Sequence, residues 1–461
     1  MDGAGIQGGT TMATHALNVS RIIDERPFSR LQITVIALCS LINFFDGIDT
    51  QSIGVAAPFI AKSLGLTIPQ LGPVFSAGLL GAAIGAVIFG AVADKVGRKR
   101  LLIIAAILIG FFTLLTAFAP SFETLLLCRF LAGIGLGGAT PCFIALTAEY
   151  TPERHRATCV TLMWSSFPLG AMVGAFVNSR LIEHLGWQAI FYIGGLLPLI
   201  IAVVLAVWLP ESLKFLIVRR NDTAAARRIL QRMGVTFPSE NTLITADGDK
   251  TERASFGSIF RQGRALGTLL LWLPFFVGFG VLTLVVLWTP SLMGMNGVTP
   301  ADAAFVVAFN GLGAFFGQAV AGRCIQRFGI VPTMAPAFVL GALATVGLGY
   351  NVDSVPLAAM YIGLVGLFLG IGTAGAIALA AEIYPTAIRA TGVGLSMAVG
   401  RFGQVCAPYI VGQTLAVGML PSQIMLGAGG AALIGGVFVL LFKLWFSHRQ
   451  AKSTINAEAV S

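Results

Sequence analysis

Long apolar stretches separated by short polar segments make up most of the sequence. Twelve of them are each about as long as the ~20 residues that a helix needs to cross a bilayer. The one long polar interruption, residues 210–265, follows the sixth stretch. Apolar runs of this length predict twelve membrane-spanning helices. They lie near residues 31–57, 68–93, 101–119, 124–147, 157–179, 187–209, 266–289, 303–322, 331–350, 355–381, 392–415 and 422–446.

The composition is typical of an integral membrane protein. Hydrophobic residues make up 56% of the 461-residue chain and charged residues 11%, and the mean hydropathy is +0.87. A soluble domain carries about 25% charged residues, so this chain cannot cover itself with polar surface. We therefore predict an all-α membrane protein, and the net charge of +9 is then a matter of topology and gives no reason to expect nucleic-acid binding.

The positive charges lie mostly on one side of the predicted helices. Only Lys62 and Arg180 fall in segments assigned to the other side. Because Lys and Arg accumulate in cytoplasmic loops, we expect both termini and the central loop in the cytoplasm. The predicted order is an N-terminal tail (1–30), a six-helix half (31–209), a central loop (210–265), a second six-helix half (266–446) and a C-terminal tail (447–461).

The two halves carry similar sequences at equivalent positions. Residues 381–391 repeat the Ala, Glu, Pro, Arg, Ala and Thr of residues 148–158, and residues 322–329 partly repeat residues 90–97. Two parallel copies of six helices with a site between them describe the major facilitator architecture. We therefore expect this fold.

Two acidic residues lie deep inside the first apolar stretch. Asp46 and Asp49 are three residues apart, so a helix places them on one face. A carboxylate in hydrocarbon costs at least ~2.5 kcal/mol, so it needs a proton, a partner or a water-filled cavity. No histidine and no other acidic residue lies well inside a predicted span. By elimination we predict that Asp46 and Asp49 carry protons, and we add nearby Asn43 as a candidate substrate-binding residue.

Arg129 and Arg401 are the only basic residues inside predicted spans. Arginine binds a carboxylate through two parallel hydrogen bonds, so both are candidate ligands of an anionic substrate. The alternative is a buried ion pair that locks two helices together. At 1.5 Å per residue, Asp49 and Arg129 can share a depth in the membrane. We expect Asp49 to neutralise Arg129 until a substrate carboxylate displaces it, after which Asp49 takes a proton.

The loop after the second stretch resembles the signature loop of the major facilitator superfamily. It reads Gly90-Ala-Val-Ala-Asp94-Lys-Val-Gly-Arg98-Lys-Arg. The resemblance implies a gate and fold latch, and Gln326, which takes the place of the acidic residue in the second copy, predicts a weaker latch there. Glutamates and arginines at the ends of other helices resemble symmetric charge pairs. The gating candidates are Gly90, Asp94, Arg98, Glu149, Arg156, Glu382 and Arg389.

Four stretches together resemble the aromatic acid:proton symporters, a family within that superfamily. They are residues 26–32, 45–51, 129–138 and 389–403, of which Asp46-Gly-Ile-Asp49 is the most specific. The resemblance implies a proton-coupled symporter that imports aromatic carboxylates resembling 4-hydroxybenzoate, protocatechuate or benzoate by alternating access. It also implies that transport needs Asp46, Asp49, Asp94 and Arg129.

Other functions stay open on the sequence alone. A proton-coupled transporter of another organic acid, or an exporter of aromatic acids, would use the same residues. A membrane-embedded sensor would need a signalling domain, for which the predicted tails are too short. We expect no enzyme activity, cofactor or metal, because the six cysteines are scattered and no catalytic motif is present. The expected partners are an aromatic carboxylate, protons and the lipid bilayer, with no nucleic acid, and the expected state is a monomer.

Overall fold

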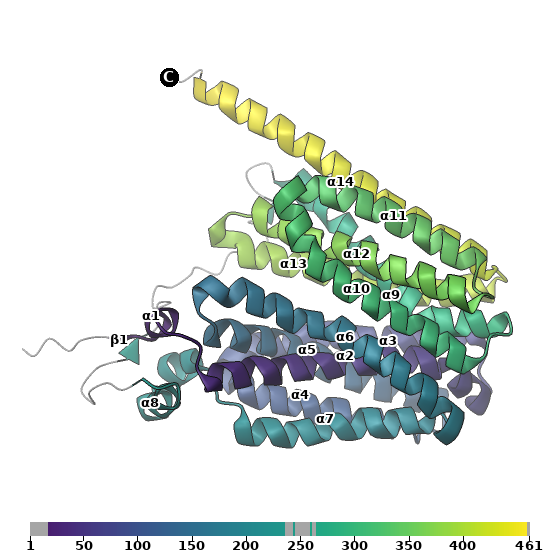
Figure 1. Cartoon of the computed structure of the whole chain (residues 1–461), viewed down its shortest axis with the longest axis horizontal. Coiled ribbons are helices and arrows are strands. Elements are labelled where there is room, and N and C mark those ends of the chain that lie inside the picture. The colour runs from purple at the N-terminus through teal and green to yellow at the C-terminus, as the bar shows by residue number, and fades with distance from the viewer. Residues whose placement is uncertain (1–16, 236–242, 245–258, 261–263, 459–461) are drawn as a thin grey trace, which may run out of the picture.

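The computed structural model describes residues 17–235, 243–244, 259–260 and 264–458 (Figure 1). Parts of the predicted tails and central loop lie outside these residues. The long helices of the N-terminal half are α2 (Arg30–Leu64), α3 (Leu71–Val96), α4 (Arg98–Thr116), α5 (Phe122–Tyr150), α6 (Glu153–Leu185) and α7 (Gln188–Trp208). Those of the C-terminal half are α9 (Ala265–Met295), α10 (Pro300–Phe328), α11 (Ile330–Tyr350), α12 (Val355–Ile383), α13 (Thr386–Ala416) and α14 (Pro421–Glu458).

These helices confirm the prediction of a twelve-helix fold. Within the described residues, eleven of them are long and apolar enough to cross a membrane. The twelfth, α13, is equally long but less apolar, since it contains Arg401 and Gln404. The last helix continues to Glu458, past the predicted end at residue 446. Its polar end stays helical because neither Gly nor Pro interrupts the backbone hydrogen bonds there.

Short elements lie outside the long helices. A 3-10 turn, η1 (Ile68–Gln70), leads into α3, and the chain before α2 forms β1 (Leu17–Asn18) and α1 (Val19–Asp24). Between the halves lie the π-helical turn η2 (Phe215–Arg219), α8 (Thr223–Arg232) and β2 (Leu243–Ile244), which pairs in parallel with β1.

Local signals set the ends of α2. Ser29 and Gln32 form a capping box at the start of the helix. The backbone amide of Gln32 donates to the Ser29 hydroxyl, and the backbone amide of Ser29 donates to the side-chain oxygen of Gln32. Gly65 ends the helix with φ +64°, a left-handed conformation that glycine adopts without a steric penalty. The helix therefore spans the whole apolar stretch that carries Asp46 and Asp49.

Each half packs its helices in the same way. In the N-terminal half, α2 packs on α6, α3 on α5 and α4 on α7; in the C-terminal half, α9 packs on α13, α10 on α12 and α11 on α14. Figure 1 shows the two halves as two layers, purple to teal below and green to yellow above. The repeat read from the sequence is therefore visible as repeated packing.

The halves are held together mainly at one end of the bundle. We call the end at which α2 begins, together with α1 and α8, the basic end, and the other the opposite end. Near the opposite end, Ser76 of α3 donates to the carbonyl of Val405 in α13 at 2.8 Å, and Phe75 packs edge-on against Trp288 of α9. Toward the basic end the helices of the two halves diverge (Figure 1).

Candidate functional site

Close packing of α2 against α6 sets the direction of its acidic face. A side chain at Gly47 would collide with the backbone carbonyl of Phe167 in α6, so glycine is needed between Asp46 and Asp49. Four residues before Gly47, the amide of Asn43 donates to the carbonyl of Trp164 at 3.3 Å. Pro168 has no N–H to bond this carbonyl.

Asn43 therefore contributes to helix packing. Its amide also donates to the carbonyl of Met163 at 2.8 Å, and the whole residue is buried. Its side-chain oxygen has no hydrogen-bond partner among the described residues. A substrate-binding role for Asn43 stays a prediction.

Asp49 and Arg129 form a buried ion pair inside the N-terminal half. Their closest atoms, Asp49 Oδ2 and Arg129 Nη1, are 3.5 Å apart, and the side chains are only 3% and 4% exposed. Thr113 of α4 joins the two, because it donates to Asp49 Oδ1 at 2.8 Å and accepts from Arg129 Nη2 at 3.0 Å. The pairing expected from equal depth is confirmed.

Two further contacts complete the surroundings of Arg129. Its Nε donates to the hydroxyl of Thr116 at 3.2 Å, and its guanidinium carbon lies 5.3 Å from the centre of the Phe191 ring. Thr116 belongs to α4 and Phe191 to α7, so the ion pair is enclosed by helices of its own half. Each of the three guanidinium nitrogens of Arg129 therefore contacts an acceptor oxygen, in Thr116, Asp49 or Thr113.

Asp46 and Arg401 lie where the two halves meet. Arg401 of α13 donates from Nη2 to the hydroxyl of Thr140 in α5 at 3.3 Å, which joins the C-terminal half to the N-terminal half. Asp46 and Arg401 interact electrostatically across this interface. The Asp46 carboxylate accepts a hydrogen bond from Thr50 at 3.3 Å. Both are partly exposed, unlike Asp49 and Arg129.

Polar side chains continue from Arg401 toward α9. Gln404, three residues further along α13, donates to the hydroxyl of Thr283 at 3.1 Å. Beyond it, the indole of Trp288 donates to the carbonyl of Pro408 at 3.2 Å and is fully buried. The interface thus changes from polar at Arg401 to apolar at the opposite end.

The signature loop forms an ionic latch at the basic end. Arg98 forms an ion pair with Glu149 of α5 and lies 3.6 Å from Asp94. Glu149 also accepts a hydrogen bond from Ser212 at 2.6 Å. The side chains of Arg98 and Glu149 are 13% and 18% exposed, whereas that of Asp94 is 77% exposed. The strongest part of the latch is therefore the contact between Arg98 and Glu149.

Glu211 ties the same loop to the chain after α7. Its carboxylate accepts hydrogen bonds from the backbone amides of Lys99 at 3.0 Å and Ser212 at 2.9 Å. The loop passes this carboxylate at Gly97, which has φ +104°, and a side chain at Gly97 would lie 2.5 Å from Glu211 Oε2. A residue other than glycine would therefore disturb both the turn and the latch.

The predicted symmetric charge pairs do not form. Arg156 donates to the carbonyl of Ala148 at 3.1 Å and Arg389 to that of Tyr384 at 3.3 Å, while Glu149 pairs with Arg98. Within the described residues Glu382 has no ion pair, and its side chain is exposed. The expectation of Glu149–Arg156 and Glu382–Arg389 pairs was wrong because the backbone carbonyls at the helix ends take the two arginines. Their gating roles stay predictions.

The glycines of α3, the helix that leads into the signature loop, differ in how closely they approach α5. Side chains at Gly81 and Gly85 would collide with the backbone carbonyls of Phe130 and Ile134 in α5, so these two glycines allow α3 and α5 to pack closely. A Cβ at Gly90 would only touch Pro141, at 3.9 Å. Packing in this conformation therefore does not require glycine at residue 90.

Several residues of these sites were missed from the sequence. Thr113, Thr116 and Thr140 gave no signal, since threonine is common in spans. Glu211 and Ser212 lie in the segment Leu209-Pro-Glu-Ser-Leu-Lys-Phe215, directly after α7. An acidic residue at the end of a span could have indicated a partner for the basic loop.

Comparison with known proteins connects this arrangement to a family. Residues 39–349 and 293–460 match the Major Facilitator Superfamily. The chain is 34% identical to the 4-hydroxybenzoate transporter PcaK of Pseudomonas putida, over 95% of this chain and 98% of that protein. It is 34% identical to a gallate transporter of Pseudomonas putida, over 87% and 90% of the two chains. A 3-(3-hydroxy-phenyl)propionate transporter of Escherichia coli (strain K12) is 35% identical, over 90% and 94%.

A solved structure shares the fold. The crystal structure of a D-xylose-proton symporter superimposes with a TM-score of 0.70 at 18% identity, covering 89% of this chain and 97% of that one. At this identity the likeness concerns the fold alone. The family match and the named relatives agree with the expectation of a transporter rather than an enzyme. The chain thus belongs to the major facilitator superfamily and, within it, to the family of the 4-hydroxybenzoate transporters.

Proposed function

We propose that this protein imports aromatic carboxylates together with protons. The observation that carries the proposal is the placement of Arg401, a cation at the interface between the halves, where it interacts with Asp46. The relatives are named for 4-hydroxybenzoate, gallate and benzoate, each an aromatic ring with a carboxylate. A guanidinium at the interface supplies the ligand that such a carboxylate needs.

The proposed coupling is an exchange of partners at Asp46. Without substrate, Arg401 balances the charge of an ionised Asp46. A substrate carboxylate that binds Arg401 removes this balance, and the loss of a nearby opposite charge favours the protonated form of a carboxyl group. Asp46 then takes a proton, so substrate and proton enter the site together without touching each other.

We thus place the coupling step at Asp46 and not at the Asp49–Arg129 pair. Asp49 and Arg129 are enclosed by α2, α4, α5 and α7, and the three nitrogens of Arg129 already have acceptors. A substrate would have to break three interactions to reach Arg129. We assign the pair to holding the N-terminal half in one shape beside the site.

The energetics favour a coupled proton. Moving an anion into a cell against an inside-negative potential costs about 2.3 kcal/mol per 100 mV. One accompanying proton cancels that charge, and a second makes the potential help uptake.

Alternating access supplies the path. The contacts near Ser76 and Trp288 hold the halves together at the opposite end, and the helices diverge toward the basic end. We assign the basic end to the cytoplasm and the protein, as a monomer, to the inner membrane, with the proposed domains 31–209 and 266–446 rocking about the site. This conformation is then inward-facing, and the latch around Arg98 belongs to the gate.

The test uses purified protein in liposomes with labelled 4-hydroxybenzoate and a panel of benzoates. A pH gradient, acid outside, should drive accumulation, and a protonophore should abolish it. Accumulation that follows sodium and ignores the protonophore would contradict the coupling. Net efflux under the same gradient would indicate an exporter, and preference for an aliphatic acid over every benzoate would contradict the substrate class.

A further inference from the structure

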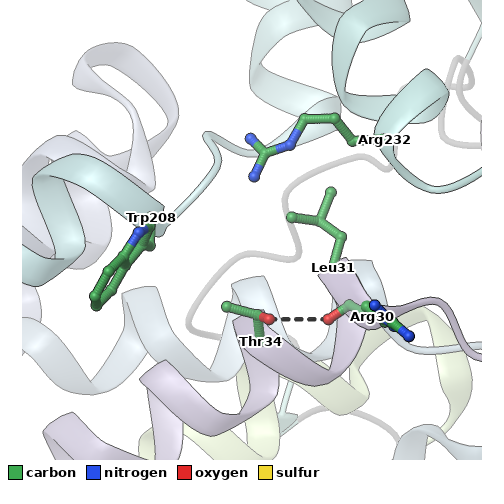
Figure 2. Close-up of a pocket in the computed structure, with 5 residues that line it drawn as sticks. All are labelled: Arg30, Leu31, Thr34, Trp208 and Arg232. Carbon is green, nitrogen blue, oxygen red and sulfur yellow. Dashed lines mark hydrogen bonds between the residues drawn. The ribbon is translucent and has the colours of Figure 1, made fainter.

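A surface pocket at the basic end lies apart from the transport site. It is lined by Arg30, Leu31 and Thr34 at the start of α2, Trp208 at the end of α7 and Arg232 at the end of α8. Figure 2 shows the Arg232 guanidinium reaching over Leu31, with Trp208 on the other side of the opening. The hydroxyl of Thr34 donates to the backbone carbonyl of Arg30 at 2.9 Å, a hydrogen bond that does not involve the Arg30 guanidinium.

The pocket is electropositive. Arg30 and Arg232 are exposed, and within the described part of the chain neither has an ion-pair partner. Lys99 nearby interacts electrostatically with the carboxylate of Glu211 as well as with Arg232, and its amine donates to the carbonyl of Ala206 at 2.8 Å. The nearby carboxylate of Glu211 accepts from two backbone amides. Glu211 balances the charge of Lys99, so the unbalanced positive charge at the pocket is that of Arg30 and Arg232.

The pocket also lies at the edge of an apolar surface. Leu31 is the first apolar residue of α2, and Trp208 is the last residue of α7. Below Trp208, which is 57% exposed, α7 presents Val207 at 68% and Val203 at 65% exposed. Tryptophan is enriched at membrane interfaces, and arginine there reaches for phosphates. The charged opening is thus continuous with a lipid-facing stripe.

We propose that this pocket binds the phosphate headgroup of an anionic phospholipid, with an acyl chain lying along the exposed stripe of α7. Arg30 and Arg232 bind the phosphate from two sides, and Trp208 marks the depth of the glycerol region. A free phosphate ion would find the same cations but would gain nothing from Val203 and Val207. The proposal does not depend on which substrate the protein carries.

Native mass spectrometry of the purified protein titrated with dioleoyl phosphatidylglycerol tests the site. A juxtamembrane cation contributes about 1 kcal/mol, so Arg30→Gln and Arg232→Gln should each weaken tight binding of one lipid roughly fivefold. The double variant should lose about 25-fold, and the lysine variants should lose less because they keep the charge. Arg327→Gln, at the basic end of α10, is the matched control and should bind normally.

Two comparisons complete the test. Dioleoyl phosphatidylcholine should bind all variants alike, and phosphatidylglycerol affinity in the double variant equal to that of the unchanged protein would overturn the proposal. Inorganic phosphate, compared with chloride at equal ionic strength, should not shift thermal unfolding. A phosphate-specific shift that the double variant loses would instead indicate a soluble anion site and would contradict the lipid assignment.

Discussion

Neutralising one member of the Asp49–Arg129 pair should destabilise the N-terminal half, and neutralising both should restore much of the loss. In Asp49→Asn, the Arg129 guanidinium stays 4% exposed and has only neutral groups around it: the asparagine amide, two threonine hydroxyls and the Phe191 ring. Breaking a buried pair by removing one partner costs about 3–5 kcal/mol. For a unit of 150–250 residues, each kcal/mol lowers the unfolding temperature by about 2–4 °C.

Thermal unfolding of the purified protein in detergent measures this effect. The single variants Asp49→Asn and Arg129→Gln should each unfold about 6–20 °C lower. The double variant should lose clearly less than either, because it contains no unpaired charge. Asp46→Asn is the matched control and should change much less, because Asp46 and Arg401 are partly exposed and water can solvate the charge left on Arg401. A double variant no more stable than the singles, or equal losses in Asp46→Asn and Asp49→Asn, would refute the reasoning.

Three further predictions concern packing, the latch and substrate binding. Gly47→Ala should place a methyl group against the α6 backbone at a cost of about 1–3 kcal/mol or more, and should lower the yield of folded protein. Gly294→Ala is the control, because a Cβ at Gly294 has no atom within 4 Å, and its yield should not fall. Equal yields of the two variants would contradict the packing argument. Glu149→Gln should lower the unfolding temperature through loss of about 1.5–3 kcal/mol of charged hydrogen bonding, while the exposed repeat-related Glu382→Gln should leave it unchanged; a larger effect at Glu382 would show the latch to be misplaced. Arg401→Lys should keep uptake proton-dependent but raise the KM for 4-hydroxybenzoate at least fivefold, because the two-pronged contact is lost; an unchanged KM would remove Arg401 from the binding site.

The features that could be predicted from the sequence are those set by the length of apolar runs or by the rarity of charged residues inside spans. Twelve spans followed from apolar runs, and Asp46, Asp49, Arg129 and Arg401 stood out because charges inside spans are rare. The pairing of Asp49 with Arg129 followed from depth alone, since rise per residue is nearly constant in a helix.

The rotation of each helix about its axis could not be read in the same way. It decides that Arg129 faces α4 and α7 inside its own half while Arg401 faces the other half. Close backbone contacts at glycines such as Gly47 set this rotation, and they depend on the partner helix. For the same reason the sequence paired Glu149 with Arg156, which is nearby in the chain, rather than with Arg98.

The most direct test of the proposed coupling uses liposomes that contain the Asp46→Asn variant. Two activities are compared: exchange of labelled for unlabelled substrate, and accumulation of substrate under a pH gradient. Asparagine cannot take up the proton, but it leaves Arg401 free to bind a carboxylate. The account predicts that the variant exchanges labelled for unlabelled 4-hydroxybenzoate across the membrane yet fails to concentrate it under an imposed pH gradient, acid outside. If Asp46→Asn still accumulates substrate under that gradient to the level of the unchanged protein, Asp46 is not the coupling site and the proposed exchange at Arg401 is wrong.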